Sequence, residues 1–324
     1  MKKFLTYILL IICLLLVGCG GHKHEYYNGI CNCGEMNVHM HEFIDGVCAC
    51  GKEVSGYSGK VNDFYIEGNT VKKYMGVKTD VAIPERYLVN NEYVLVTTLD
   101  KNIFTNGVLN ISLYIPITIK QIDPQALIGA GTLRTIQVSN FNKHYISIDG
   151  DLYTRDKTTL VRFACSTFLD EYKVIDSVTT IGDFAFAYAM INKLIINENV
   201  TSIGNASFYG SLLSNIEISE NNANYTVEDN VIYSKDKTTL IYYMSSKTNQ
   251  EFTIPSSVTT IKEAAFYNPM LLGTITIPNS VTTVEKNAFV LLKEAVVKCE
   301  QASKPSTWDN EWINNNEYVS WGTK

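Results

Sequence analysis

A short phrase of sequence recurs along this chain, and the recurrence constrains the fold more than any other feature. The stretch IPSSVTTIKEAAF (Ile254 to Phe266) returns later in the chain as IPNSVTTVEKNAF (Ile277 to Phe289). Three further stretches follow the same pattern and begin at Ile115, Val174 and Ile196. A fixed period of about 20 to 50 residues is the signature of a repeat architecture, in which copies of one small unit stack on each other.

A second, longer element is also duplicated. YISIDGDLYTRDKTTLVRF (Tyr145 to Phe163) recurs without gaps as YTVEDNVIYSKDKTTLIYY (Tyr225 to Tyr243). Each copy is typical of a hairpin or an extra coil that turns at its Arg/Lys-Asp-Lys group. The chain therefore contains two copies of one larger unit, each made of a long element and short repeats, and a cap precedes them.

Each short repeat combines a strand with a turn. In TITIP (Thr274 to Pro278) the residues Ile275 and Ile277 face one way, and the proline then ends strand pairing. After the proline of a repeat the spacing changes: Val258 and Ile261 lie three residues apart, which favours a turn or a short helix. One such unit has too few apolar residues to offset the entropy of ordering its backbone, so neighbouring copies must supply each other's core.

The repeated phrase resembles the BspA-type leucine-rich repeats of bacterial surface proteins, over about Phe64 to Cys299. The resemblance implies a β-rich leucine-rich-repeat solenoid of short parallel strands with turns and short helices. It also implies exposure on the cell surface, and adhesion or protein binding without catalysis. Three copies depart from the pattern. The copies that begin at Val174 and Ile196 lack the proline, with Asn197 in its place in the second, and Leu127 replaces the final phenylalanine in the copy that begins at Ile115.

Both ends of a solenoid need covering. The stretch from Glu67 to Pro84 resembles the first coil of the family, and Cys299 to Trp312, running on to VSWG, resembles its end cap and gathers all three tryptophans. An exposed aromatic binding patch is the alternative. The predicted parts are a lipoprotein signal peptide (1–18), a Cys/His-rich double module with linker (19–57), the solenoid with its first cap (58–298) and a C-terminal cap (299–324).

The first residues are typical of an export signal. Two lysines precede an apolar run from Phe4 to Val17, which is shorter than the roughly 20 residues that a membrane-spanning helix requires. LVGC (Leu16 to Cys19) resembles a bacterial lipobox, and the resemblance makes Cys19 the lipidated first residue of the mature protein. We therefore expect the chain at the outer face of a cell membrane; a plain signal peptide with an incidental cysteine is the alternative.

Two copies of a cysteine and histidine module follow. HKHEYYNGICNCG (His22 to Gly34) and HMHEFIDGVCACG (His39 to Gly51) superimpose without gaps. Each offers two imidazoles and two thiols across an Asn/Asp-Gly turn, an inventory that suits zinc, although structural zinc sites usually space their cysteines as C-x-x-C. Disulfides and a solvated spacer remain alternatives. The candidate metal ligands are His22, His24, Cys31, Cys33, His39, His41, Cys48 and Cys50.

Little in the sequence indicates catalysis. His144 is the only histidine outside the modules, and its counterpart in the second long element is Asn224, so no Ser-His-Asp set can be assembled. Asp149 and Asp151 occupy predicted turn positions, where aspartate bonds the local backbone. A net charge of −6 without a basic stripe makes nucleic acid an unexpected partner. We expect no enzyme activity.

The strand pattern also predicts which side chains point outward from the stack. Ala82 begins this row, and a solvated sheet face and a contact surface are equally compatible with its mixed composition. The candidate binding residues are Tyr114, Gln137, Lys173, Ile195, Glu217, Thr253 and Thr276. Our first functional hypothesis is a lipid-anchored surface protein that binds an extracellular or host protein or glycan. The alternative is a zinc-binding surface lipoprotein with the solenoid as scaffold.

Overall fold

The computed structural model describes residues 61–323 apart from 106–110, 131–132, 165–167, 245–249, 268–272, 292–294 and 315, and the backbone of four short strands between residues 26 and 48. Within this part of the chain, helix is confined to three 3₁₀ segments, Val61–Asp63, Ile128–Ala130 and Asn316–Tyr318. None of the helices described is long and apolar enough to span a bilayer. The predicted β-rich solenoid is confirmed, and the stretches predicted as turns or short helices are mostly turns.

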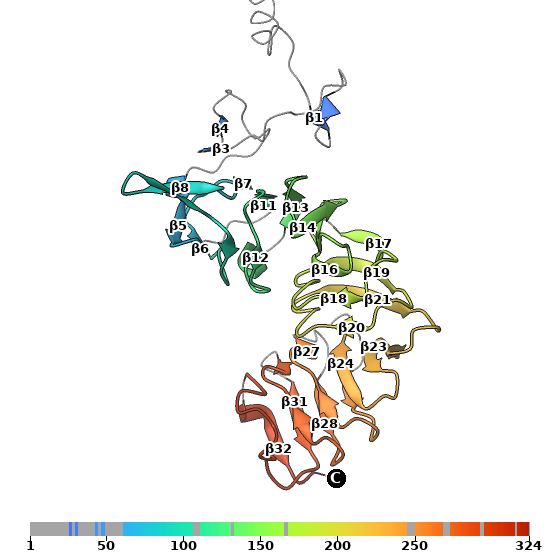
Figure 1. Ribbon diagram of the computed structural model, residues 1–324. Helices are drawn as coiled ribbons and strands as arrows, with labels where there is room; N and C mark the ends of the chain where they lie inside the picture. The colour runs from blue at the N-terminus through green and yellow to red at the C-terminus, as the bar shows by residue number, and fades with distance from the viewer. Residues whose placement is uncertain are drawn as a thin grey trace, which may run out of the picture. The chain divides into compact units, whose positions relative to one another are not determined.

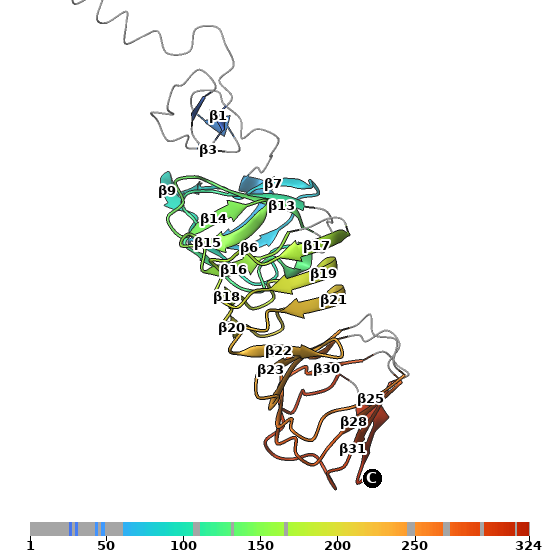
Figure 2. The same ribbon diagram turned by 90° about the vertical axis from the view of Figure 1, so that its right-hand side faces the viewer.

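Parallel strands from successive repeats pair side by side, as Figures 1 and 2 show for β17, β19 and β21. Three sheets carry the strands that precede the repeated phrase. They are β7 (Asp80–Ala82), β11 (Ile111–Ile115) and β13 (Leu133–Val138); β17 (Leu169–Lys173), β19 (Met190–Ile196) and β21 (Leu212–Ile218); and β25 (Glu251–Thr253), β28 (Thr274–Ile277), β31 (Val296–Cys299) and β32 (Val319–Trp321).

A second set of sheets lies further along each repeat. They are β5 (Phe64–Glu67), β6 (Thr70–Tyr74), β10 (Thr98–Leu99) and β12 (Gln121–Ile122); β14 (Tyr145–Ile148), β15 (Asp151–Thr154), β16 (Thr159–Arg162), β18 (Thr180–Ile181) and β20 (Ser202–Ile203); β22 (Tyr225–Glu228), β23 (Val231–Ser234), β24 (Thr239–Tyr243), β26 (Thr260–Ile261) and β29 (Thr283–Val284). Two small pairs complete the fold: β27 (Phe266–Tyr267) with β30 (Phe289–Val290), and β8 (Arg86–Val89) with β9 (Glu92–Leu95).

Residues that pair between neighbouring strands are separated in the sequence by one repeat period. Ile181 pairs with Ile203, and Ile261 pairs with Val284, in parallel register. Val258 and Val281, one period apart, are both buried in the same hydrophobic cluster. Each repeat therefore forms one layer, and its apolar residues pack against the same residues of the next layer.

The phenylalanine that closes each repeat stacks on its counterpart. The rings of Phe266 and Phe289 lie 4.7 Å apart and within 4° of parallel, and those of Phe186 and Phe208 lie 5.7 Å apart and within 5°. Tyr243, at the end of the second long element, stacks on Phe266 at 5.3 Å and so continues the column. These aromatic columns bury large apolar surfaces between layers.

The two long elements are three-stranded meanders. In the first, β14 pairs antiparallel with β15, and β15 pairs antiparallel with β16, which then joins the parallel strand β18. The second, β22 to β24, has the same pattern and joins β26. The predicted turns at the Arg/Lys-Asp-Lys groups are present, with Lys157 at φ 64° and Lys237 at φ 59°.

Buried side-chain amides tie successive layers together. Asn142, Asn197 and Asn222 are each at most 5% exposed. Each donates hydrogen bonds from Nδ2 to two backbone carbonyls of the preceding layer; those of Asn222, both 2.9 Å long, reach the carbonyls of Asn197 and Val200. These amides donate to carbonyls of the preceding layer at positions where the chain turns, so both the amides and the carbonyls have partners.

Tryptophans close the C-terminal end of the core. Trp308 is 2% exposed and Trp312 is 1% exposed, and the ring of Trp312 meets Phe289 edge-on at 5.4 Å. The ring of Trp321 on β32 packs on the rings of Trp308 and Trp312, with centroids 5.8 and 6.2 Å away. Because the first two rings are buried, they do not form the exposed aromatic patch that was the alternative interpretation.

Candidate functional site

The predicted outward residues lie opposite one another as expected, but in three separate rows. Tyr114 on β11 pairs with Ala82 and with Gln137. The second row, Lys173, Ile195 and Glu217, crosses β17, β19 and β21. In the third, Thr253 pairs with Thr276. The prediction of a single continuous row was wrong, because each meander interrupts the series of parallel strands and starts a new sheet.

Exposure differs along these rows. Gln137, Lys173, Glu217 and Thr253 are exposed, whereas Tyr114, Ile195 and Thr276 are half-buried. Ala82, also expected to face outward, is only 5% exposed. Burial raises the pKa of the Tyr114 hydroxyl, which is hydrogen-bonded to Ser139. Tyr114 is therefore a poor aromatic anchor for a partner.

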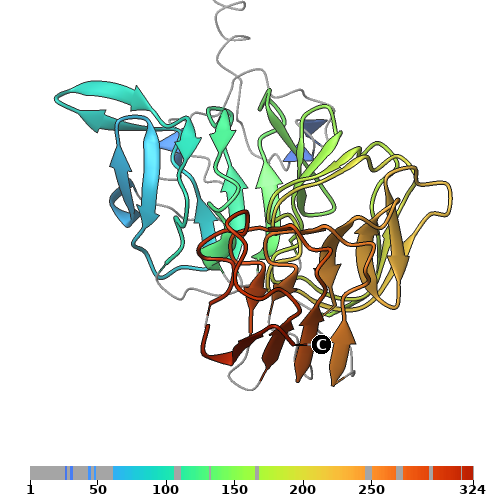
Figure 3. The same ribbon diagram turned by 90° about the horizontal axis from the view of Figure 1, so that it is seen from below.

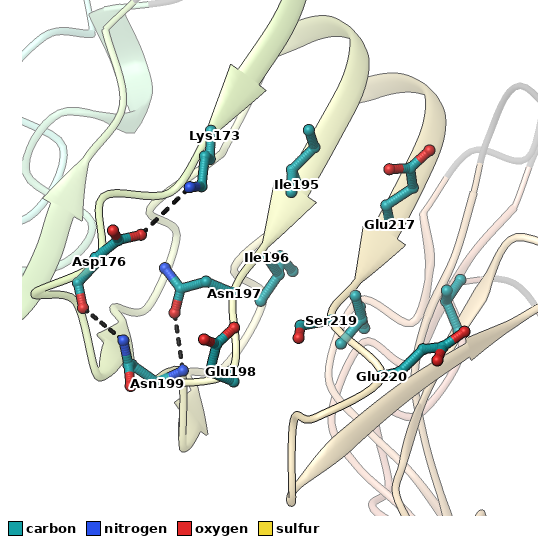
Figure 4. Close-up of a pocket in the computed structure, with 12 residues that line it drawn as sticks. Lys173, Asp176, Ile195, Ile196, Asn197, Glu198, Asn199, Glu217, Ser219 and Glu220 are labelled. Atoms are coloured by element: carbon teal, nitrogen blue, oxygen red, sulfur yellow. Dashed lines mark hydrogen bonds and ion pairs between the residues drawn. The ribbon is translucent and has the colours of Figure 1, made fainter.

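A groove of about 590 Å³ opens beside the middle row, at the carboxyl ends of β17, β19 and β21 and the turns that follow them (Figure 4). It contains all three outward residues of that row. Its lining residues are Lys173, Asp176, Ile195, Ile196, Asn197, Glu198, Asn199, Glu217, Ile218, Ser219, Glu220 and Val227.

Asparagines hold the floor of the groove. Asn197 stands where other repeats have proline, and its Oδ1 accepts a hydrogen bond from the amide of Asn199 at 2.9 Å. The Nδ2 of Asn199 donates to the carbonyl of Asp176, one layer earlier, at 2.9 Å. The floor is thus fixed by the same cross-layer amides that stabilise the fold (Figure 4).

The groove is lined by four carboxylates and one lysine. That lysine, Lys173, lies 3.4 Å from Asp176. On the same sheet, Lys193 bridges Glu171 at 3.5 Å and Glu217 at 3.0 Å, and the hydrogen bond to Glu217 raises the pKa of Lys193. The site therefore offers an apolar strip at Ile195 inside a charged, net acidic rim.

A sequence profile decides the family of the part of the chain that carries this groove. The profile described as "BspA type Leucine rich repeat region" matches residues 161–294 in six copies. Residues 161–294 are a BspA-type leucine-rich repeat region. The middle outward row, the residues Thr253 and Thr276 of the third row, and the groove lie on this BspA-type region. A search of curated proteins found no match to this chain.

Three solved structures also resemble the chain. A leucine-rich repeat protein of Eubacterium ventriosum has 22% identity over 72% of this chain and 67% of its own, with a TM-score of 0.40. A leucine rich cell surface protein of Faecalibacterium prausnitzii has 18% identity over 76% and 77%, with a TM-score of 0.37. The pneumococcal vaccine antigen PcpA has 18% identity over 80% and 85%, with a TM-score of 0.38. At these values no residue role is carried over to this chain.

The other candidate site residues lie elsewhere. The side chains of His22, His24, Cys31, Cys33, His39, His41, Cys48 and Cys50, and residue Cys19, fall outside the described side chains. Backbone pairing is described for two hairpins there: β1 (Tyr26–Tyr27) with β2 (Ile30–Cys31), and β3 (Phe43–Ile44) with β4 (Val47–Cys48). Among the described residues, no three His, Cys, Asp or Glu side chains are grouped to hold a metal ion.

Asp151 differs from its prediction as a turn residue. It begins β15 and is 4% exposed; its Oδ1 accepts the amide of Ala164 and its Oδ2 accepts the hydroxyl of Tyr172, both at 2.7 Å. Tyr172 is in turn bonded to the hydroxyl of Tyr153 at 2.9 Å. Burial raises the pKa of Asp151 to about 7. This carboxyl does not line the groove, so it gives the groove no acid or base.

Stability should depend on pH through this carboxyl. Its pKa rises from 3.8 to about 7 on folding, so the folded state binds the proton more tightly and stability falls as pH rises through this range. The difference in unfolding free energy between the native chain and Asp151→Asn should change by roughly 3 kcal/mol between pH 4 and 7. Urea unfolding at both pH values measures it.

The second copy of the meander supplies the control. At the positions equivalent to Asp151 and Tyr172 it has Val231 and Phe252. The double variant Asp151→Val with Tyr172→Phe reproduces that apolar arrangement and should also lose this pH dependence. Equal pH dependence in the native chain and in both variants would contradict the assignment of the buried proton to Asp151.

Proposed function

We propose that this chain is a non-enzymatic, lipid-anchored surface protein whose repeats bind a protein or glycan outside the cell. Three observations support the proposal. The first residues have the pattern of a lipoprotein export signal. The BspA-type repeats form a stacked scaffold. The groove at the middle row combines an apolar strip with a charged rim.

The groove carries the proposal because its composition is that of a contact surface. An apolar centre inside a polar rim is the usual anatomy of a protein interface. Ile195 lies between Lys173 on one strand and Glu217 on the next. With four carboxylates to one lysine, the groove favours a ligand segment with positive charge over an acidic polysaccharide.

Substitution at the centre of the groove tests this proposal. Ile195→Lys removes the apolar centre and adds a positive charge that opposes a cationic ligand segment, so binding to the preferred ligand should weaken at least about 10-fold. The measurement is surface plasmon resonance, with the chain immobilised and a panel of secreted and matrix proteins and glycans in solution.

Thr253→Lys is the matched control, because it adds the same charge in the third row, outside the groove. It should leave affinity unchanged. The proposal is contradicted if no partner in the panel binds saturably at micromolar concentration, or if the two substitutions weaken binding equally.

A zinc-binding role for the N-terminal modules is the second candidate. The observation in its favour is that both modules form a hairpin in the same register, with Tyr26 opposite Cys31 and Phe43 opposite Cys48. Reduced chain purified without a chelating tag should then contain about one or two zinc ions, measured by inductively coupled plasma mass spectrometry. Less than half an ion per chain would rule this candidate out, and Cys31→Ser with Cys48→Ser should lower the content.

A further inference from the structure

The β8–β9 hairpin is a ribbon that no other described strand joins. Its four pairs run from Arg86 with Leu95 to Val89 with Glu92, and the turn residues Asn90 and Asn91 have φ of 49° and 64°. Figure 3 shows it projecting past the neighbouring strands β5 and β6. Among the strands described, β8 and β9 pair only with each other.

The hydrogen-bond pattern shows which backbone groups point outward. The amide of Val96 donates to the carbonyl of Glu85 at 2.8 Å. In an antiparallel pair, hydrogen-bonded and non-hydrogen-bonded positions alternate. Tyr93 and Leu95 therefore occupy non-hydrogen-bonded positions, and their amides and carbonyls point away from β8. No described residue provides a partner for these groups.

The same two residues expose apolar side chains. Tyr93 and Leu95 are each 53% exposed, and Leu88, which pairs with Tyr93 and so shares its face, is 56% exposed. The opposite face is anchored, because Tyr87 packs on the core and its hydroxyl donates to the carbonyl of Gly68 at 2.7 Å. The apolar face is therefore held away from the protein.

Natural proteins usually protect such an edge. Lysine, proline or a β-bulge on an edge strand prevents pairing with another chain. The outward positions Tyr93 and Leu95 carry none of the three, the charged residue of β9, Glu92, points to the opposite face, and the ribbon register has no irregularity. An isolated two-stranded ribbon is also only marginally stable in water, and a third strand would stabilise it.

We propose that the outer edge of β9 binds an extended segment of a partner protein as a third, antiparallel strand. Main-chain hydrogen bonds to Tyr93 and Leu95 would give affinity. Side chains at alternate positions of the partner segment would lie beside Tyr93 and Leu95, so we expect apolar residues at those positions of the segment. This contact is separate from the groove and does not depend on it.

Two other occupants fit the ribbon less well. A lipid surface would cover the apolar face but would leave the amides and carbonyls of the edge without partners in hydrocarbon, which is costly. A second copy of the chain would need about 800 Å² from each partner for a stable dimer. The ribbon's exposed apolar face is only on the order of a few hundred Å². A short peptide strand needs no larger area.

The strand β9 offers a better edge than β8. On β8 the outward positions are Leu88 and Arg86, and the Arg86 guanidinium lies 4.2 Å from the centre of the Tyr93 ring and has further interactions. On β9 both outward positions carry half-exposed apolar side chains. The partner strand is therefore placed beside Tyr93 and Leu95.

A peptide with and without usable amides tests the proposal. The probe is a fluorescein-labelled peptide, Thr-Val-Thr-Val-Thr-Val-Thr-Lys. One control peptide has N-methyl groups on the three valine amides, and a second has them on the threonine amides. Because alternate amides of a strand point to the same edge, each control blocks strand pairing along one of the two edges of the peptide. Fluorescence anisotropy with the full chain should show saturable binding below about 1 mM for the unmodified peptide, and at least about 10-fold weaker binding for one methylated form.

Variants of the chain locate the binding edge. Leu95→Pro removes an outward amide without removing a β8–β9 hydrogen bond, and should weaken binding at least about 10-fold. Leu95→Thr keeps the amide but removes the apolar side chain, and should weaken binding less. Hydrogen exchange should show new protection in peptides that contain residues 93–95 when the probe binds, with the meander residues 231–234 unchanged.

Several results would overturn this proposal. One is that the probe does not bind at about 1 mM. Another is that both methylated peptides bind as tightly as the unmodified one. A third is that neither Leu95→Pro nor Leu95→Thr changes the affinity for the probe. Protection of residues 93–95 by phosphatidylcholine–phosphatidylglycerol vesicles but not by the probe would instead identify a lipid surface. Protection that rises with protein concentration alone would identify a second copy.

Discussion

Contact between equivalent residues of neighbouring layers is the interaction on which the rest of this structure depends. A single repeat cannot bury its own apolar side chains, so each needs the repeat before it and the repeat after it. One pair of layers shows this contact. Ile261 pairs in parallel register with Val284, and the ring of Phe266 stacks on that of Phe289. Where the series ends, Trp308 and Trp312 take the place of the next repeat.

Surface features follow from this contact. Because paired strands hold equal positions side by side, Lys173, Ile195 and Glu217 line up on one face. The groove forms where the turns after these strands project, and the buried Asn197 and the exposed Asn199 hold those turns. A scaffold of this kind fixes the positions of surface side chains without any of them being needed for folding, which leaves them available for binding.

The sequence period was sufficient to predict the layers, the register of the outward residues and the meander turns, because these depend on residues that recur. Features that occur once were harder to predict. The outward residues were expected to form one row, but a meander inserts backbone between β13 and β17 and separates the sheets. Such a break depends on how the inserted strands pair, which the period does not show.

Polar residues inside the core were also missed or misread. Asp151 follows an Asp-Gly pair that is typical of a turn, yet its carboxyl is buried with Tyr172; the counterpart Val231 was the available signal that the position faces inward. Asn142 and Asn222 could have been noticed as asparagines that precede the two duplicated elements at equivalent positions. Among the described strands, the β8–β9 ribbon has no counterpart in the other repeats, so no pattern pointed to it.

Disulfide trapping on the third outward row tests the layered packing most directly. Thr253 pairs with Thr276, and Thr276 pairs with Lys298, so Thr253 and Lys298 are two layers apart. Adjacent strands lie about 4.8 Å apart, within disulfide range, whereas two layers give about 9.6 Å, which is beyond it. Under mild oxidation, with linked peptides identified by mass spectrometry, the Thr253→Cys and Thr276→Cys pair should cross-link rapidly and the Thr253→Cys and Lys298→Cys pair should not. Equal rates for the two pairs, or cross-linking only of the second, would contradict the layered structure.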